Sequence, residues 1–189
     1  MTRTTLALDD ELVAKAQAFT GLKEKSSLVR EALKALIERE SARRLARLGG
    51  SEPGIDPPAQ KAAGAGLILI DTSVWIDHFR AGNGRLARLL DGGRVLTHPF
   101  VIGELALGAM RQRGVILAAL SDLPRAELAT DGEVLGLIDA RALCGRGVGY
   151  VDVHLLASVR LTAGAGLRTR DNRLRHVAEE LGLARRRFA

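Results

Sequence analysis

The chain has 189 residues and a hydrophobic fraction of 47%, enough apolar side chain to bury a core, which excludes wholesale disorder. No uncharged run is long enough to span a membrane, and acidic residues soon after Met1 argue against a signal peptide. A single cysteine excludes an internal disulfide framework, so we expect a cytoplasmic protein.

The net charge of +6 predicts a polyanionic partner. Residues 1–66 contain 11 basic residues (Lys and Arg) and 9 acidic residues (Asp and Glu). Residues 67–189 contain 17 basic and 13 acidic residues. All 17 basic residues of the second part are arginine, which binds phosphate in a bidentate manner. Aromatic residues make up only 3%, which argues against an aromatic platform for stacking bases. Charge alone fits a merely soluble basic surface equally well, so the partner must be inferred from particular residues.

Residues 49–66 divide the chain. This segment holds three of the five prolines and five glycines, a composition that sustains neither a helix nor a central strand. We interpret it as a linker between a module at residues 1–48 and a domain at residues 67–189.

Residues 2–9 alternate between polar and apolar side chains, which predicts a short half-buried strand. A first helix follows, capped by Asp9 or Asp10 and closed by Gly21. A longer helix follows, with Ser26 or Ser27 as its cap, and its charged tail ends at Gly49. One strand in about 48 residues cannot form a sheet or an adequate core alone. We therefore expect the strand to pair with its copy in a second chain, which gives a homo-oligomer.

After the linker, short apolar strands alternate with helices. Trp75 and Phe79, four residues apart on the first of these helices, are expected in the core. This alternation predicts an α/β domain of three layers around a parallel sheet. The expected strands are residues 67–70, 94–97 and 166–169, and the expected helices include one opened by Pro99 and those at residues 131–143, 151–161 and 172–181.

Four acidic residues of this domain occupy positions that surface charge explains poorly. Asp71 ends an apolar strand, at the carboxyl edge where open α/β sheets place their sites. Asp171 follows the strand at residues 166–169 and opens the last helix. Glu104 is the only charged residue of an apolar helix, and Asp152 is the only acid near the start of another.

Each acid taken alone has a structural explanation or needs a partner. Asp71, Asp152 and Asp171 are all positioned to cap helices. Glu104 lies in mid-helix, where capping does not apply. Four such acids together indicate one pocket for a divalent cation, and Mg²⁺ or Mn²⁺ prefers all-oxygen ligands.

Other chemistries fit the sequence less well. One cysteine and four scattered histidines give no zinc spacing, and neither a GxSxG elbow nor a Walker loop is present. His154 is interpreted as a packing or capping histidine. Thr72 and Ser73 follow Asp71 closely enough to orient it or hold a metal-bound water, and Asn172 has the same relation to Asp171 or is a capping residue.

The segments IDTSVWIDHFR, HPFVIGELALG, GVGYVDVHLLAS and TRDNRL together resemble a PIN-domain toxin of the VapC type. The resemblance covers residues 67–189, and residues 1–58 resemble the matching VapB antitoxin. It implies a Mg²⁺-dependent endoribonuclease that cuts structured RNA, often tRNA. The acidic quartet of that family matches Asp71, Glu104, Asp152 and Asp171, and Thr72, Ser73 and Asn172 occupy the supporting positions.

The resemblance also implies that residues 1–48 form a ribbon-helix-helix module that dimerises and binds operator DNA. We expect a two-stranded ribbon in the major groove, with Arg3 and Thr5 facing the bases. Backbone amides near Ser26 and Ser27 are expected to take a phosphate, assisted by Lys25.

The chain departs from the family in two ways. Toxin and antitoxin are normally separate chains, and here they are continuous. Antitoxins of this kind commonly end in a basic tail, whereas only Lys61 is basic between Arg47 and the end of the linker. We therefore expect Leu45 and Leu48 to dock on the nuclease through apolar contacts, and the fused antitoxin to inhibit it by steric cover.

Two other functions fit the sequence. One is a DNA-binding repressor with a catalytically silent PIN-like domain. The other is a nuclease for a different substrate, such as single-stranded DNA. The four carboxylates argue against the silent domain, because a non-enzyme has no reason to keep them together.

Overall fold

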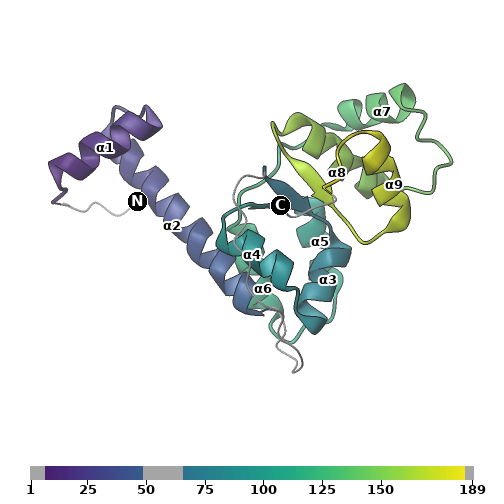
Figure 1. Ribbon diagram of the computed structural model, residues 1–189, viewed down its shortest axis with the longest axis horizontal. Helices are drawn as coiled ribbons and strands as arrows, with labels where there is room; N and C mark the ends of the chain where they lie inside the picture. The colour runs from purple at the N-terminus through teal and green to yellow at the C-terminus, as the bar shows by residue number, and fades with distance from the viewer. Residues whose placement is uncertain (1–6, 49–65, 186–189) are drawn as a thin grey trace. The chain divides into compact units, whose positions relative to one another are not determined.

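The computed structural model describes residues 7–48 and 66–185 (Figure 1). The chain forms two compact units, Met1–Glu38 and Arg39–Ala189. The division falls inside one helix, α2 (Lys25–Leu48), so the last ten residues of that helix belong to the second unit. The domain limits predicted from the linker stay a prediction, and the linker itself lies outside the described residues except for Gly66.

Helix α1 (Asp10–Thr20) has the ends that local chemistry predicts. Asp9 is its N-cap, and its carboxylate accepts hydrogen bonds from the amides of Glu11 and Leu12 at 2.9 and 3.0 Å. Gly21 ends the helix with φ of 72°, a left-handed conformation that glycine adopts without strain. Both predicted ends of this helix are confirmed.

Helix α2 begins earlier than predicted. The amide of Leu28 donates to the carbonyl of Glu24 at 3.0 Å, so the helix starts at Lys25. Ser26 and Ser27 therefore lie within the first turn, and the prediction that one of them caps the helix is wrong. The amides of residues 25–27 still precede the first hydrogen bond of the helix and lack an acceptor within it.

The predicted N-terminal strand falls mostly on residues 1–6, outside the described residues, as do Arg3 and Thr5. Residues 7–9 are described and are not in a strand. Several large apolar side chains of the first unit are exposed, as expected for a module that needs a partner: Leu12, Phe19, Leu33 and Ile37.

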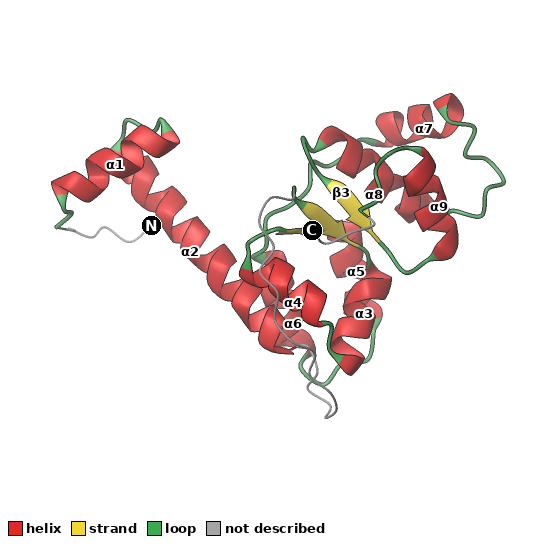
Figure 2. Cartoon of the chain, in the orientation of Figure 1, coloured by secondary structure: helices red, strands yellow, loops and turns green. Residues whose placement is uncertain are grey.

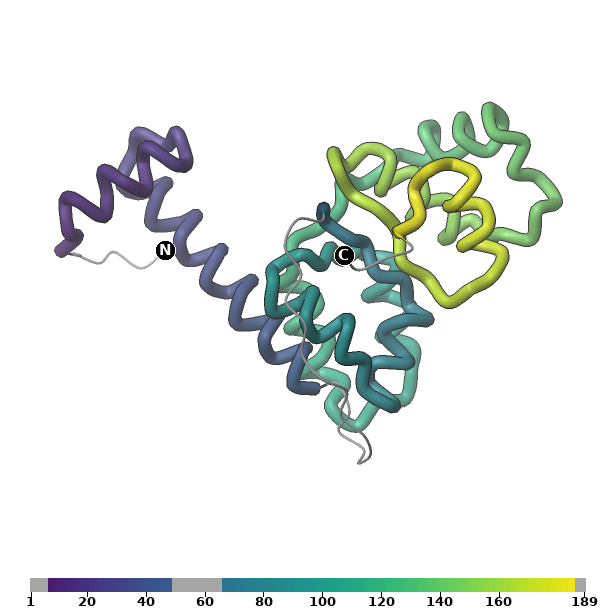
Figure 3. The backbone as a smooth tube through the Cα atoms, viewed as in Figure 1, coloured from purple at the N-terminus to yellow at the C-terminus, as the bar shows by residue number. Residues whose placement is uncertain are grey.

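The second unit is built on a parallel sheet of three strands in the order β2-β1-β3. Strand β1 (Ile68–Ile70) is central and pairs with β2 (Val95–Leu96) and β3 (Gly166–Arg168). Figure 3 shows that β1 and β3 lie side by side although about a hundred residues separate them in the chain. This pairing confirms the predicted α/β class and brings the carboxyl ends of β1 and β3 together.

Helices surround the sheet; in Figure 2, α3–α6 lie below the strands and α7–α9 to their right. Five were predicted from apolar periodicity, with ends that differ by a few residues at most: α3 (Thr72–Ala81), α5 (Pro99–Leu107), α7 (Asp131–Ala140), α8 (Tyr150–Leu161) and α9 (Asn172–Glu180). Two were not predicted: α4 (Gly84–Asp91) and α6 (Arg113–Ser121).

The end of α2 is part of the core of the second unit. Ala42 and Leu45 are 3% and 0% exposed, and Leu48 packs against the same core. The Nε2 atom of buried His78 lies 2.9 Å from the carbonyl oxygen of Leu45, and Ser41 donates to Asp122 at 2.8 Å. The predicted apolar docking of Leu45 and Leu48 is therefore confirmed.

Within residues 7–48 and 66–185, no helix is both long enough and apolar enough to cross a membrane.

Candidate functional site

Two of the four candidate acids stand where adjacent parallel strands end. Asp71 follows β1 and is the N-cap of α3, while Asp171 lies three residues after β3 and is the N-cap of α9. The amide of Asp71 donates to the carbonyl of Arg168 at 3.0 Å, which continues the pairing of the two strands. Each acid therefore caps a helix, as predicted, and the two caps share one edge of the sheet.

Asp71 is 7% exposed, and two hydroxyl groups hold it. Its Oδ2 atom accepts hydrogen bonds from Ser73 Oγ and from Thr169 Oγ1, the second at 2.8 Å. Thr169 also accepts from the amide of Asp171 at 2.9 Å and so ties the two acids together. The sequence analysis missed Thr169, and its only local signal is a hydroxyl at a strand end two residues before an acid.

Glu104 and Asp152 come from two helices, α5 and α8. Thr72 donates to Glu104 Oε2, and the amide of Gly149 donates to Asp152 Oδ2 at 2.7 Å. Asp152 is half-buried, whereas Glu104 and Asp171 are exposed. The expectation that all four acids avoid solvated surface is therefore wrong for these two, because both project from helices at the surface.

The four acids interact through their charges. The pKa of Asp152 is raised chiefly because burial disfavours the charged form. The hydrogen bond from Gly149 opposes this shift, and the negative charges of Asp71, Asp171 and Glu104 add to it. Although the four acids are far apart in the sequence, the other three thus lie close enough to Asp152 to disfavour its ionisation.

A divalent cation fits the chemistry of this group. In the described part of the chain, no three His, Cys, Asp or Glu side chains converge closely enough to form a ready metal cluster. One oxygen of each carboxylate is nevertheless held by a neighbouring donor, and the second has no hydrogen-bond donor among the described residues. Four oxygen ligands with mutual repulsion are the set that Mg²⁺ or Mn²⁺ would neutralise.

The three supporting candidates are placed differently. Ser73 donates to Asp71, the orienting role predicted for it, whereas Thr72 donates to Glu104 and not to Asp71. The side-chain oxygen of Asn172 instead accepts from Arg175, on the next turn of α9. The structure therefore brings two of the three supporting side chains to the acids.

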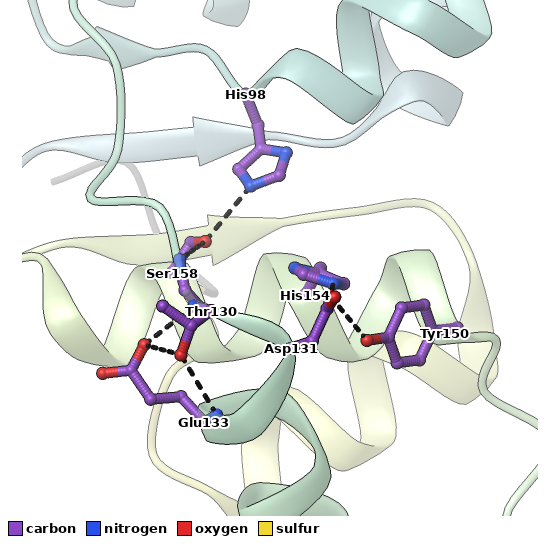
Figure 4. Close-up of polar contacts among 8 residues, drawn as sticks. His98, Thr130, Asp131, Glu133, Tyr150, His154 and Ser158 are labelled. Carbon is purple, nitrogen blue, oxygen red and sulfur yellow. Dashed lines mark hydrogen bonds and ion pairs between the residues drawn. The ribbon is translucent and has the colours of Figure 1, made fainter.

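His98 and His154 have structural roles (Figure 4). His98 is the N-cap of α5: its Nδ1 accepts from the amide of Phe100 at 3.2 Å, so its Nε2 donates to Ser158 at 3.1 Å. Burial, with a smaller effect from His154, lowers the pKa of His98 to about 4. His154 is buried with its ring edge-to-face against Phe100 and Tyr150, which confirms it as a packing residue.

The described DNA-contact candidates lie at the start of α2. Lys25 forms an exposed ion pair with Asp10 at 3.3 Å, and such a pair is weak enough to yield to a phosphate. Ser26 is exposed and Ser27 is partly buried.

The fold agrees with comparisons to known proteins. Residues 68–180 match the PIN domain family, so the chain belongs to that family. Residues 2–48 match the family of VapB antitoxins of bacterial type II toxin–antitoxin systems.

Named relatives exist for both parts. The chain is 50% identical to Ribonuclease VapC32 of Mycobacterium tuberculosis, strains CDC 1551/Oshkosh and H37Rv, over 118 residues, 62% of this chain and 95% of the relative. It is 61% identical to Antitoxin VapB32 of the same species over 51 residues, 27% of this chain and 78% of the relative. The protein is thus a fusion of a VapB-type antitoxin and a VapC-type PIN domain. No solved structure matches the chain significantly.

Proposed function

We propose that residues 67–189 are a metal-dependent endoribonuclease, the toxin, and that the fused antitoxin both restrains it and binds operator DNA. The observation that carries the nuclease is geometric: Asp71 and Asp171 stand where adjacent parallel strands end, and Thr169 bonds to both. Similarity to Ribonuclease VapC32 supports RNA as the substrate, and tRNA is the RNA that the family resemblance suggests.

The residues of the site would hold the ion and position the phosphodiester. Asp71, fixed by Ser73 and Thr169, is the rigid ligand, and Asp171 is held next to it through Thr169. Glu104 and Asp152 approach from α5 and α8. When bound, Mg²⁺ or Mn²⁺ supplies Lewis-acid activation of water and neutralises charge on the phosphate. The products are expected to carry 5′-phosphate and 3′-hydroxyl ends.

Labelled RNA tests this function directly. The intact chain and the chain cut within the linker, with the antitoxin part removed, are incubated with RNA in Mg²⁺ or in EDTA. We expect cleavage in Mg²⁺, none in EDTA, and a higher rate after removal. A chain that binds DNA but leaves RNA intact in every condition would instead be a repressor with a silent PIN domain.

Restraint by the antitoxin is proposed from the buried end of α2. Among the described residues, its polar contacts with the second unit are with His78 of α3 and with Asp122 after α6, and not with the acids. These contacts do not themselves cover the acidic site, so steric cover would have to come from other residues of the antitoxin part. Cutting the linker without removing residues 1–48 should raise activity little, because Leu45 keeps the helix docked.

Operator binding is proposed for a dimer of the N-terminal module. The exposed apolar side chains of the first unit support dimerisation, and the unsatisfied amides at the start of α2 suit a phosphate. Lys25→Ala should weaken the binding of operator DNA and of random DNA to the same extent. The slope of log K against log salt should fall by the amount that corresponds to about one phosphate contact. Lys34→Ala, which removes an exposed lysine further along the same helix, is the control. Equal effects of the two variants would contradict a role for Lys25.

A further inference from the structure

Two adjoining cavities lie beside the acidic site on the surface of the second unit. One has a volume of about 550 Å³ and the other about 630 Å³, and they share Arg168 and Arg170 in their walls. The first extends along α9 to Arg175 and Arg185, and the second along α4 to Arg85 and Arg88. We call the two cavities together the arginine groove.

The arginine groove is strongly basic. Its walls contain six arginines, namely Arg85, Arg88, Arg168, Arg170, Arg175 and Arg185. Only two carboxylates line it, those of Asp77 and Glu179. The excess of four positive charges comes from α4, β3, α9 and the residues that follow them, so it is a product of the fold and not of a local run of basic residues.

The positive charges are close enough to act on each other. Burial is the main reason that the pKa of Arg168 is lowered, and the charges of Arg85, Arg170 and Arg175 lower it further. Repulsion of this kind within one groove is relieved by a polyanion that spans it.

The groove leads directly to the acids. The amide of Arg170 donates to Ser73 Oγ at 3.0 Å, and that hydroxyl in turn donates to Asp71. Arg168 is in register with Ile70, the residue before Asp71. The backbone that carries Arg168 and Arg170 therefore adjoins Asp71, so a strand whose phosphates lie in the groove would pass close to this carboxylate.

We propose that the arginine groove binds the phosphodiester backbone of the RNA strand on one side of the bond that is cut. Guanidinium groups bind phosphate in a bidentate manner and carry no base information, so the groove holds the strand without reading its sequence. This inference rests on the proposed ribonuclease function, because it assigns the path of that substrate.

The test compares two double variants of the full chain with equal loss of charge. Arg85→Gln with Arg175→Gln removes one exposed guanidinium from each cavity. Arg141→Gln with Arg160→Gln removes two exposed guanidiniums from α8 and the end of α7, outside the groove. Binding of a fluorescein-labelled single-stranded RNA is followed by anisotropy in EDTA at several salt concentrations.

We expect the groove variant to bind RNA about tenfold more weakly and the control to bind within about twofold of the unchanged chain. The slope of log K against log salt should fall by roughly 1.4 in the groove variant, about 0.7 for each lost phosphate contact. Equal weakening by both double variants, or none by either, would overturn the proposal. Binding through the N-terminal module contributes equally to all three proteins and does not alter the comparison.

The outcomes separate this inference from the proposed function. If the groove variant loses RNA binding but no protein cleaves RNA in Mg²⁺ even after removal of the antitoxin part, the groove is supported and the nuclease is refuted. If RNA is cleaved at the normal rate and both double variants bind RNA with the same affinity, the nuclease is supported and the proposed role of the groove is refuted.

Discussion

Replacing Asp71 and Asp152 with asparagine should abolish RNA cleavage by the protein from which the antitoxin part has been removed, with a loss of at least about 10³-fold. Loss of two carboxylate ligands removes several kcal/mol of stabilisation of the transition state. Each 1.36 kcal/mol added to the activation free energy lowers the rate by a factor of about ten. The rate is measured on labelled RNA in Mg²⁺. Asp139→Asn, at an exposed acid of α7, is the matched control and should cleave at the normal rate.

The same variant has a separable effect on stability. Asparagine keeps an oxygen for the donors Ser73, Thr169 and Gly149, so the fold is retained. In EDTA the double variant should melt at the same temperature as the unchanged chain or a few degrees higher. Burial, and to a smaller extent repulsion by the other acids, disfavour the charge of Asp152 and raise its pKa, and asparagine removes that charge. Mg²⁺ should raise the melting temperature of the unchanged chain only. Normal cleavage by a folded double variant would refute the acidic site.

Leu45→Ala should lower the free energy of unfolding of the second unit by about 2–5 kcal/mol, the usual cost of truncating a fully buried leucine. Leu45 is 0% exposed, and its carbonyl oxygen accepts from buried His78 when Nε2 carries the proton. Urea unfolding is followed by the fluorescence of Trp75, the only tryptophan of the chain and fully buried in this unit. The midpoint should shift to lower urea without a change in slope.

Arg47→Ala is the control for Leu45→Ala, because it changes an exposed residue of the same turns of α2 and should alter stability by less than about 0.5 kcal/mol. An unchanged midpoint for Leu45→Ala would show that the end of α2 is not part of this core in solution. If the prediction holds, residues 67–189 alone form an incomplete unit, and the increase in activity on removing the antitoxin is offset by loss of stability.

The sequence by itself determined the features that depend on neighbouring residues. Capping by Asp9, Asp71 and Asp171 follows from a short acidic side chain just before an apolar helical stretch, and the structure has all three caps. The parallel sheet follows from apolar runs of strand length that alternate with helices. The position of Asp71 at a strand end was therefore available from local pattern alone.

Only the tertiary structure decided what depends on contacts between distant residues. Thr169 joins Asp71 across 98 positions, and no local pattern marks it as a partner. The arginines of the groove come from separate elements whose proximity is set by the order of the strands. Apolar docking of Leu45 was predicted, but its partner His78 and the bond from Ser41 to Asp122 follow only from the packing of the second unit. The physical reason is that burial and charge coupling are summed over neighbours in space, whereas periodicity and capping are fixed by neighbours along the chain.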